Sequence, residues 1–367
     1  MNENRLLALH DAGVSIWLDT LSRELLETGA FAALVDGSAV TGATSNPTIF
    51  ANAITGSDRY DDQLRSLAAA GTEDSRELFF AIALDDVSRA AEILRAAHDR
   101  SGGGDGFVSF ECTPDVADDT EATIAQAVDL WRRLDLPNVL IKVPATRAGV
   151  GAIEELTARG VNVNVTLLFS VERYDEVIEA YLRGLERRLD AQLPVRGIAS
   201  VASFFVSRID AKADSVLDAG SAVRGHVAIA NAHHAYARYL DRFSGARWEA
   251  LRQAGATPQR PLWASTGTKD PSYSDVLYVE RLIAPGVINT MPLPTLRAFA
   301  DHGDAERTLG PGLSVASGVL SAAAAAGVDL DAITSRLERE GVQAFCDSYA
   351  ELLRCIEAKR GALTAAR

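Results

Sequence analysis

The chain has 367 residues, 47% of them hydrophobic and 23% charged, which is enough to bury a sizeable core as one large domain or two ordinary ones. Its formal net charge of −14 argues against nucleic acid and anionic membrane surfaces as partners, because both require basic patches. The three cysteines fit neither a paired disulfide framework nor a zinc motif. Since we also find no signal-peptide pattern and no apolar run of membrane-spanning length, we expect a cytoplasmic protein.

Short runs rich in β-branched residues recur along the chain between turn or polar residues, and we interpret them as strands. In chain order they are 14–19 (VSIWLD), 40–45 (VTGATS), 107–113 (FVSFECT), 139–144 (VLIKVP), 161–169 (VNVNVTLLF), 198–206 (IASVASFFV), 261–266 (PLWAST) and 287–292 (VINTMP). Helical patterns such as 119–134 and 171–189 separate most of them. Strands that alternate with helices pair in parallel, so eight of them predict a closed (β/α)8 TIM barrel of the α/β class.

Two longer helical segments interrupt this alternation. Residues 51–106 predict extra helices inserted after the second strand, and residues 304–367 predict a C-terminal helical extension. Because no Pro/Gly/Ser-rich linker divides the chain, we expect residues 1–367 to form a single decorated barrel domain.

Lys142 is unusual because it lies inside the apolar run NVLIKVPAT (138–146) of a chain with only four lysines. Lys212 and Lys359 lie in charged helical segments where exposure to solvent is expected, and Lys269 lies beside a turn. Charged residues are rarely buried unless they are paired or functional. Lys142 is therefore either half of a structural ion pair with Glu111 or a reactive amine.

Other polar residues also follow the predicted strands, where a (β/α)8 barrel gathers its chemistry. Most have a structural interpretation too: a helix cap for Asp19, a turn for Asn46, satisfied core hydroxyls for Thr166 and Ser203, and a surface ion pair for Arg208. The full set is Asp19, Asn46, Glu111, Lys142, Asn164, Thr166, Ser203, Arg208, Ser265, Thr266 and Lys269.

The functional interpretation is that a carbonyl-attacking lysine needs this set of neighbours. A lysine forms a Schiff base as the neutral amine, which an apolar site favours. One carboxylic acid must then move protons as water leaves, and a second must take a substrate proton as a carbon–carbon bond breaks. Glu111 and Asp19 are the candidates for these two roles. Asn and Thr side chains can hold hydroxyls, and an Arg with a Lys can hold a phosphate.

Five motifs, in this order and spacing, resemble the transaldolases of the pentose phosphate pathway, specifically their longer bacterial form. They are GATSNPTIF, VLIKVPAT, GVNVNVTLLFS, ASVASFFVSRIDAKAD and WASTGTKDPSYSD, and the likeness runs from about residue 12 to the C-terminal helix. The resemblance implies that dihydroxyacetone is transferred from a ketose phosphate to an aldose phosphate through a lysine Schiff base, with no cofactor and no metal. Sugar phosphates are then the expected ligands, and both a monomer and a homodimer are compatible with the sequence.

The resemblance also implies roles for single residues. The Schiff-base lysine of the family corresponds to Lys142, and its proton-transferring groups correspond to Asp19, Glu111 and Thr166. Its substrate-binding residues correspond to Asn46, Asn164, Ser203, Phe205 and Arg208, and we add Ser265 and Lys269. Lys269 departs from the arginine that shorter family members have, and CTPDVADDT after Glu111 departs from the expected pattern.

Three alternatives remain open at this point. A Schiff-base aldolase of the same group would release free dihydroxyacetone. A metal-dependent barrel hydrolase would need converging histidines and carboxylates, whereas the adjacent His233 and His234 lie in a helical pattern and point in different directions. A non-enzymatic scaffold would not need the polar residues at the strand ends.

Overall fold

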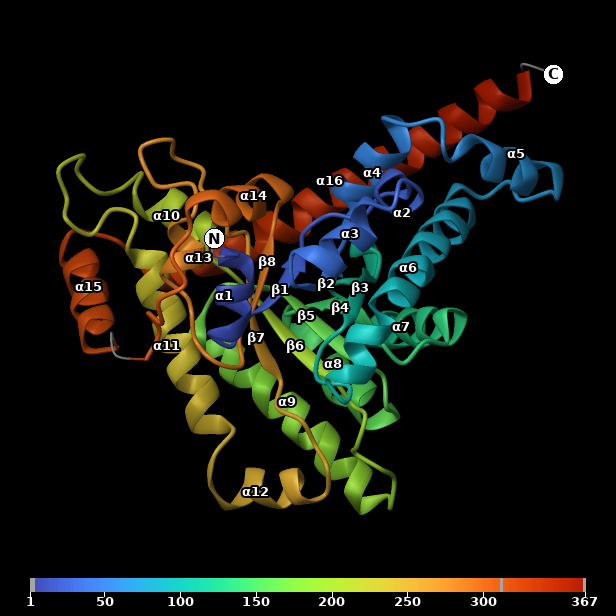
Figure 1. The fold of residues 1–367 in the computed structure, drawn as a ribbon. Helices are drawn as coiled ribbons and strands as arrows, with labels where there is room; N and C mark the ends of the chain where they lie inside the picture. The colour runs from blue at the N-terminus through green and yellow to red at the C-terminus, as the bar shows by residue number, and fades with distance from the viewer. Residues whose placement is uncertain (1–3, 311–312, 366–367) are drawn as a thin grey trace.

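The computed structural model describes residues 4–310 and 313–365. Residues 1–3 of the predicted domain, and residues 311–312 and 366–367 of its predicted C-terminal extension, lie outside the described residues. Eight parallel strands pair in chain order, and β1 closes the sheet against β8 into a barrel surrounded by helices (Figure 1). The expected (β/α)8 barrel is thereby confirmed. The strands are β1 (Ser15–Leu18), β2 (Val40–Thr44), β3 (Phe107–Glu111), β4 (Val139–Pro144), β5 (Val163–Leu168), β6 (Ser200–Phe205), β7 (Arg260–Ala264) and β8 (Ile288–Met291).

One helix precedes the first strand, and the helices between and after the strands follow the predicted alternation. They are α1 (Arg5–Asp11), α2 (Arg23–Glu27), α3 (Ala30–Gly37), α4 (Pro47–Thr55), α5 (Asp61–Ala69), α6 (Ser75–Arg100), the 3-10 turn η1 (Pro114–Val116), α7 (Thr120–Leu134), α8 (Arg147–Arg159), α9 (Val171–Asp190), α10 (Ser207–Ala213), α11 (Val227–Arg242), α12 (Gly245–Gln253), α13 (Leu277–Glu280), α14 (Leu293–His302), α15 (Leu313–Ala325) and α16 (Leu330–Ala365). Both predicted additions are present: α5 and α6 extend the segment after β2, and α15 and α16 follow α14.

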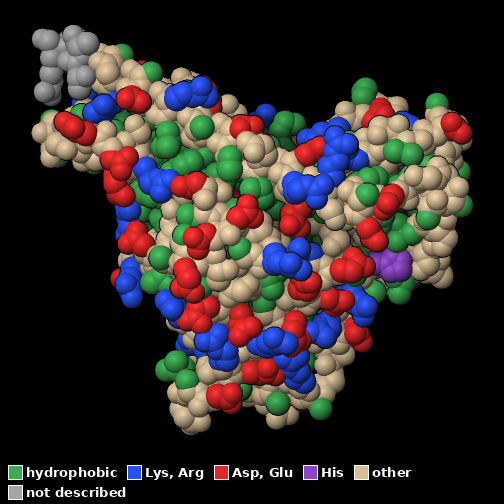
Figure 2. Space-filling view, turned by 180° about the vertical axis from the view of Figure 1, so that it is seen from behind, with side chains coloured by type: hydrophobic (Ala, Val, Ile, Leu, Met, Phe, Trp, Pro, Cys, Tyr) green, Lys and Arg blue, Asp and Glu red, His purple; other side chains and the backbone are tan. Residues whose placement is uncertain are grey.

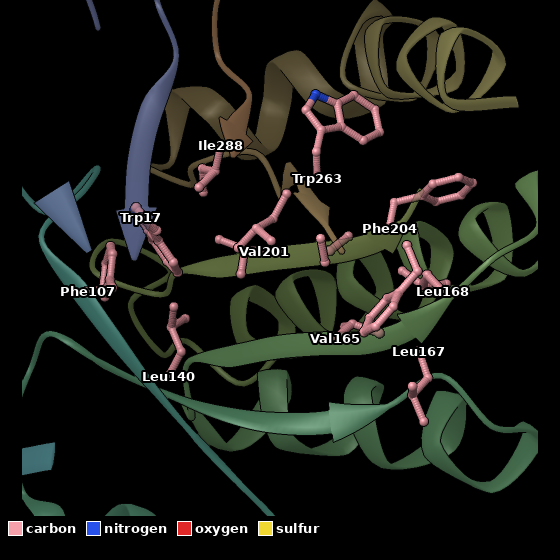
Figure 3. Packing of buried hydrophobic residues seen from close by; sticks show 14 of the residues in the cluster. Trp17, Phe107, Leu140, Val165, Leu167, Leu168, Val201, Phe204, Trp263 and Ile288 are labelled. Atoms are coloured by element: carbon pink, nitrogen blue, oxygen red, sulfur yellow. The ribbon is translucent and has the colours of Figure 1, made fainter. Parts of the chain in front are cut away.

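The strands are buried along nearly their whole length, which is why they appear in the sequence as almost continuous apolar runs. Branched and aromatic side chains from several strands pack together (Figure 3). Trp17 of β1 shows how tight this packing is, because a Cβ at Gly42 would lie 2.5 Å from its indole ring. The Trp17 indole also donates a hydrogen bond to Asp105 at 2.9 Å, so its buried N–H is satisfied.

The C-terminal helix α16 packs against α4, α5, α6, α10 and β5. Figure 1 shows it running past α4 and α5 to the C-terminus. Lys359 of α16 donates to the carbonyl oxygens of Ile54 and Ser57, and lies 2.9 Å from a carboxylate oxygen of Asp61. The expected solvent exposure of Lys359 is therefore wrong, because its ammonium group ties α16 to the segment after α4.

Lys212 also differs from the expected exposed lysine. It lies in α10, its side chain is only 32% exposed, and its ammonium is 2.8 Å from a Glu340 carboxylate oxygen in α16. Both lysines expected at the surface thus hold α16 in place, Lys212 against α10 and Lys359 against the α4–α5 segment.

The surface carries charges of both signs. Acidic and basic side chains are interspersed over the face drawn in Figure 2. Ion pairs account for part of this pattern, and Arg247 for example contacts Glu179 at 2.8 Å and Glu186 at 2.6 Å. Within residues 4–310 and 313–365, no single helix has both the length and the apolar character to span a membrane, although α15 and α16 meet that test as a bent pair by length and composition.

Candidate active site

Lys142 lies near the C-terminal end of β4, between Glu111 of β3 and Asn164 of β5 in the strand register. Its side chain is buried, and its Nζ donates a hydrogen bond to the Ser45 carbonyl oxygen at 3.2 Å. Glu111 and Lys142 interact electrostatically but form no direct ion pair. The interpretation of these two residues as a structural ion pair is therefore wrong, and the amine lies beside the carboxyl group without being fixed to it.

A cavity of about 150 Å³ opens above Lys142 at the carboxyl ends of the strands. Eight of the residues singled out in the sequence line it: Asp19, Asn46, Lys142, Ser203, Phe205, Arg208, Ser265 and Lys269. They come from strands far apart in the sequence, and the closed barrel brings them together. Glu111, Asn164 and Thr166 do not line this cavity and lie buried at the strands on either side of Lys142.

Asp19 does not cap the helix that follows it. The helix α2 begins at Arg23, and the hydroxyl of Ser22 caps it by accepting from the Leu25 N–H. The Asp19 carboxylate instead accepts a hydrogen bond from the Thr44 hydroxyl at 2.8 Å, and Thr44 lies 2.8 Å from the hydroxyl of Thr290. These two threonines line the cavity and were missed in the sequence, because a hydroxyl inside an apolar strand looks like a core residue.

Glu111 is the buried acid of the site. Burial raises its pKa to about 7, the Lys142 charge acts in the opposite direction, and the Asp19 charge adds to the rise. Its Oε2 has no hydrogen-bond partner. A carboxylic acid whose pKa lies near neutrality can both give and take a proton.

Thr166 likewise has a buried hydroxyl without a partner, so its interpretation as a satisfied core hydroxyl is wrong. The β5–β6 register shifts between Val165 and Leu168, and Leu167 has a left-handed φ of +57°. A bulge of this kind redirects neighbouring side chains and is common beside active sites. It distorts β5 at the residue after Thr166.

The remaining polar residues on β5 and β6 form a hydrogen-bonded chain. Ser203 donates to the amide oxygen of Asn164 at 2.7 Å, and the Asn164 amide donates to the Ser109 hydroxyl at 2.8 Å. Ser203 is thus satisfied, as its structural interpretation expects, yet it also lines the cavity. Asn46 combines two roles in the same way: its side chain caps α4 by accepting from the Ile49 N–H at 3.0 Å, and the residue lines the cavity.

Positive charge gathers at one end of the cavity. Arg208 lies over the Phe205 ring, 5.1 Å from its centroid, and takes part in no ion pair among the described residues, which contradicts the surface ion pair expected for it. Burial lowers the pKa of its guanidinium, while the Asp19 charge opposes the change. Lys269 is exposed at the same cavity. An anion entering here would meet two cations.

Ser265 lines the cavity with φ at +55°, and its hydroxyl is 2.9 Å from that of Ser207. Thr266 points elsewhere, because its hydroxyl donates to Asn289 at 3.0 Å and to the Thr290 carbonyl at 3.1 Å. Of the two hydroxyls considered beyond the seventh strand, only that of Ser265 belongs to a residue lining this cavity.

Two carboxylate–tyrosine pairs join the segments that carry these groups. Asp210 of α10 accepts a hydrogen bond from the Tyr278 hydroxyl at 3.0 Å, and Asp214 accepts one from the Tyr273 hydroxyl at 2.7 Å. Burial raises the pKa of Asp210 to about 7. The pairs hold α10, which contains Arg208, and the residue that follows it against the segment after Lys269.

Phe345 of α16, which no motif of the sequence marks, lines the cavity together with Lys142. Tyr349, one turn further along α16, lines a small adjoining chamber of about 10 Å³ that also contains Glu111 and Cys112. These two side chains place the C-terminal helix over the open end of the barrel.

Within the described residues, no three or more His, Cys, Asp and Glu side chains are grouped as a metal site would require. His233 and His234 line separate cavities, as expected for neighbours on a helix.

Comparison with known proteins confirms the resemblance drawn from the motifs. The transaldolase/fructose-6-phosphate aldolase family model matches residues 16–356. A protein named transaldolase from Frankia alni is 50% identical over 364 residues, which cover 98% of each chain. Proteins named transaldolase from Saccharopolyspora erythraea and Acidothermus cellulolyticus are 50% and 49% identical, over 96% and 95% of this chain and 97% and 94% of theirs. The chain therefore belongs to the transaldolase/fructose-6-phosphate aldolase family.

Proposed function

We propose that this protein is a transaldolase of the non-oxidative pentose phosphate pathway. It transfers a dihydroxyacetone unit from a ketose phosphate, sedoheptulose 7-phosphate or fructose 6-phosphate, to an aldose phosphate, glyceraldehyde 3-phosphate or erythrose 4-phosphate. The observation that carries the proposal is the buried Lys142 amine, which shares a cavity with the Asp19 carboxylate and with the Arg208 and Lys269 cations and neighbours the buried Glu111. The names of relatives about 50% identical over nearly the whole chain support it.

The first half of the reaction builds the Schiff base. The neutral Lys142 amine attacks the C2 carbonyl of the donor, and a C–N bond forms as the carbonyl oxygen takes a proton. Glu111 supplies the proton with which that oxygen leaves as water. Its pKa of about 7 and the free Oε2 suit this role, because the acid must release and regain a proton near neutrality. Thr166, whose hydroxyl is also free, assists the proton transfer.

The second half breaks and remakes a carbon–carbon bond. Asp19 takes the proton of the C4 hydroxyl, C4 becomes the aldehyde carbon of the departing aldose phosphate, and the C3–C4 electron pair moves into the protonated imine. A three-carbon enamine stays on Lys142. An incoming aldose phosphate is then attacked at its aldehyde carbon, Asp19 returns the proton to its oxygen, and water releases the new ketose. The Thr44 hydroxyl holds the Asp19 carboxylate in place.

The substrate lies along the cavity from Lys142 to the cationic end. Arg208 and Lys269, with Ser265, hold the phosphate, and Asn46 and Ser203 hold hydroxyl groups near the amine. Asn164, which lies outside the cavity, acts through its hydrogen bond with Ser203. Phe205 supports Arg208 through the contact of its ring with the guanidinium. We further propose that residues 1–367 form one domain, because α16 packs on the barrel. We also propose that the protein is cytoplasmic.

Covalent capture tests this proposal. Borohydride reduction after incubation with fructose 6-phosphate should fix a dihydroxyacetone adduct on the protein, and peptide mass spectrometry should locate it at Lys142. Lys142→Arg keeps the charge but removes the nucleophile, so it should show neither adduct nor transfer. Lys269→Arg is the matched control and should still form the adduct. An adduct on another lysine, or full activity in Lys142→Arg, would overturn the mechanism.

The second candidate is a Schiff-base aldolase that releases free dihydroxyacetone, because the family also contains fructose-6-phosphate aldolases. Measuring free dihydroxyacetone in the presence and absence of an acceptor aldose phosphate separates the two activities.

A further inference from the structure

One side of the active-site cavity is formed by Phe345 of α16, from outside the barrel, and we call this side the roof. Every other residue that lines the cavity belongs to a strand or to the segment that follows one, whereas Phe345 belongs to α16. The residue is 8% exposed, so it is buried between the helix and the barrel end. Phe345 and Tyr349 are four residues apart, which places them on the same face of α16. That face covers both the cavity at Lys142 and the chamber at Glu111.

Several contacts hold α16 close over this end of the barrel. A Cβ at Gly341 would lie 2.9 Å from the Leu167 side chain, so the helix approaches the bulge of β5 as closely as a glycine permits. Ser348 accepts a hydrogen bond from the Thr48 hydroxyl at 2.8 Å. The lysine contacts described above, through Lys212 and Lys359, hold the helix on either side of Phe345.

We propose, on the basis of the transaldolase activity inferred above, that Phe345 is a specificity-determining residue that keeps water away from the three-carbon enamine on Lys142. The enamine has two fates. It either attacks an acceptor aldehyde, or it takes one proton on carbon and becomes an imine that water hydrolyses. In the hydrolysis the water oxygen becomes the carbonyl oxygen of dihydroxyacetone, the C–N bond breaks, and the lysine amine is regenerated.

Phe345 favours transfer because its aromatic ring keeps solvent from the enamine carbon, which must take a proton before water can hydrolyse the resulting imine. The cavity is also lined by the cations Arg208 and Lys269, which can still bind an acceptor phosphate. Removing the ring opens the roof without removing any group that binds or reacts. Water then competes with the acceptor, and the enzyme shifts from transfer toward release of free dihydroxyacetone.

The test compares three variants on one ratio, the free dihydroxyacetone released per molecule transferred to erythrose 4-phosphate. In Phe345→Ala the ratio should rise about tenfold or more, because the rate of hydrolysis increases relative to the rate of transfer. Phe345→Leu keeps a smaller apolar side chain and should give an intermediate ratio, and it carries the test if Phe345→Ala does not fold. Val342→Ala removes an apolar side chain from the same helix at a residue that lines neither cavity, so it should keep the parent ratio.

The outcomes separate the two proposals. A merely structural role for Phe345 would lower transfer and release together and leave the ratio unchanged, which would overturn the inference while the Lys142 adduct still forms. An equal rise in Val342→Ala would also overturn it, because the cause would then be a loosened helix. If the parent enzyme forms no Lys142 adduct and transfers nothing, the proposed function itself fails.

Discussion

Replacing Glu111 with glutamine should stabilise the folded protein at neutral pH while it impairs catalysis. The side chain is buried, and burial raises its pKa from 4.5 to about 7. In the unfolded chain the carboxyl ionises near its ordinary value, so between these two pH values the folded protein holds a proton that the unfolded chain has lost. The contribution of Glu111 to stability is therefore full below about pH 4.5 and is lost as the pH rises through about 7.

The size of this effect follows from the two pKa values. The difference amounts to about 3 kcal/mol at about 1.4 kcal/mol per pH unit. Most of the interval between the two pKa values lies between about pH 5 and about pH 8. As the pH rises across that range, the free energy of unfolding of Glu111→Gln should therefore increase by roughly 2 to 3 kcal/mol relative to that of the parent. Other groups that titrate here, such as Asp210, are present in both proteins and cancel in the comparison.

Urea unfolding of the two proteins, followed by the fluorescence of the four tryptophans, measures the difference at each pH. Glu73→Gln is the matched control, because Glu73 is exposed. The difference in free energy of unfolding between this variant and the parent should not change with pH. A flat difference for Glu111→Gln, or a variant that loses stability relative to the parent as the pH rises, would refute the view that burial keeps Glu111 protonated. Turnover of the variant should fall at every pH, because the amide cannot supply the proton for the loss of water.

Two further predictions concern the ends of the cavity. Arg208→Ala should raise the KM for fructose 6-phosphate about 10- to 100-fold but change that for unphosphorylated fructose little, because a charged hydrogen bond contributes about 1.5 to 3 kcal/mol; equal losses on both substrates would remove Arg208 from the phosphate site. Asp19→Asn should lower kcat about 10²- to 10⁴-fold, the usual contribution of a general base. Its unfolding midpoint should stay near that of the parent, because asparagine can still accept from Thr44; turnover within a fewfold of the parent would contradict the assignment.

The barrel could be predicted because its strands are buried on both faces and therefore appear as short apolar runs that alternate with helices. Most of the site could be predicted for a related reason. In a parallel barrel the residues at the strand ends meet at one place, so Lys142, Asp19 and Arg208 converge although they are far apart in the chain. Local patterns also assigned some alternatives wrongly. Asp19 looked like a helix cap, yet Ser22 lies at the position from which a side chain reaches the first turn of α2.

The roof could not be predicted, because nothing in the sequence near Phe345 distinguishes it from other apolar residues of a long amphipathic helix. Its position over Lys142 depends on where α16 docks, and that depends on tertiary contacts such as the close approach of Gly341 to Leu167. The bulge was equally hidden. A leucine with φ at +57° opposes the local preference of the residue, so only packing around β5 accounts for it.

The distribution of the four lysines bears on why one amine reacts. Most of the basic residues are arginines, which form ion pairs but offer no usable amine for a Schiff base. Lys212 and Lys359 engage carboxylates and carbonyl oxygens along α16, so their amines serve to hold the roof. Lys269 is exposed at the cavity, where its side chain can bind a phosphate. Lys142 is the remaining amine, and it is buried at the strand ends with a hydrogen bond to a single carbonyl oxygen, that of Ser45. To attack a donor carbonyl, this amine has to give up only that hydrogen bond.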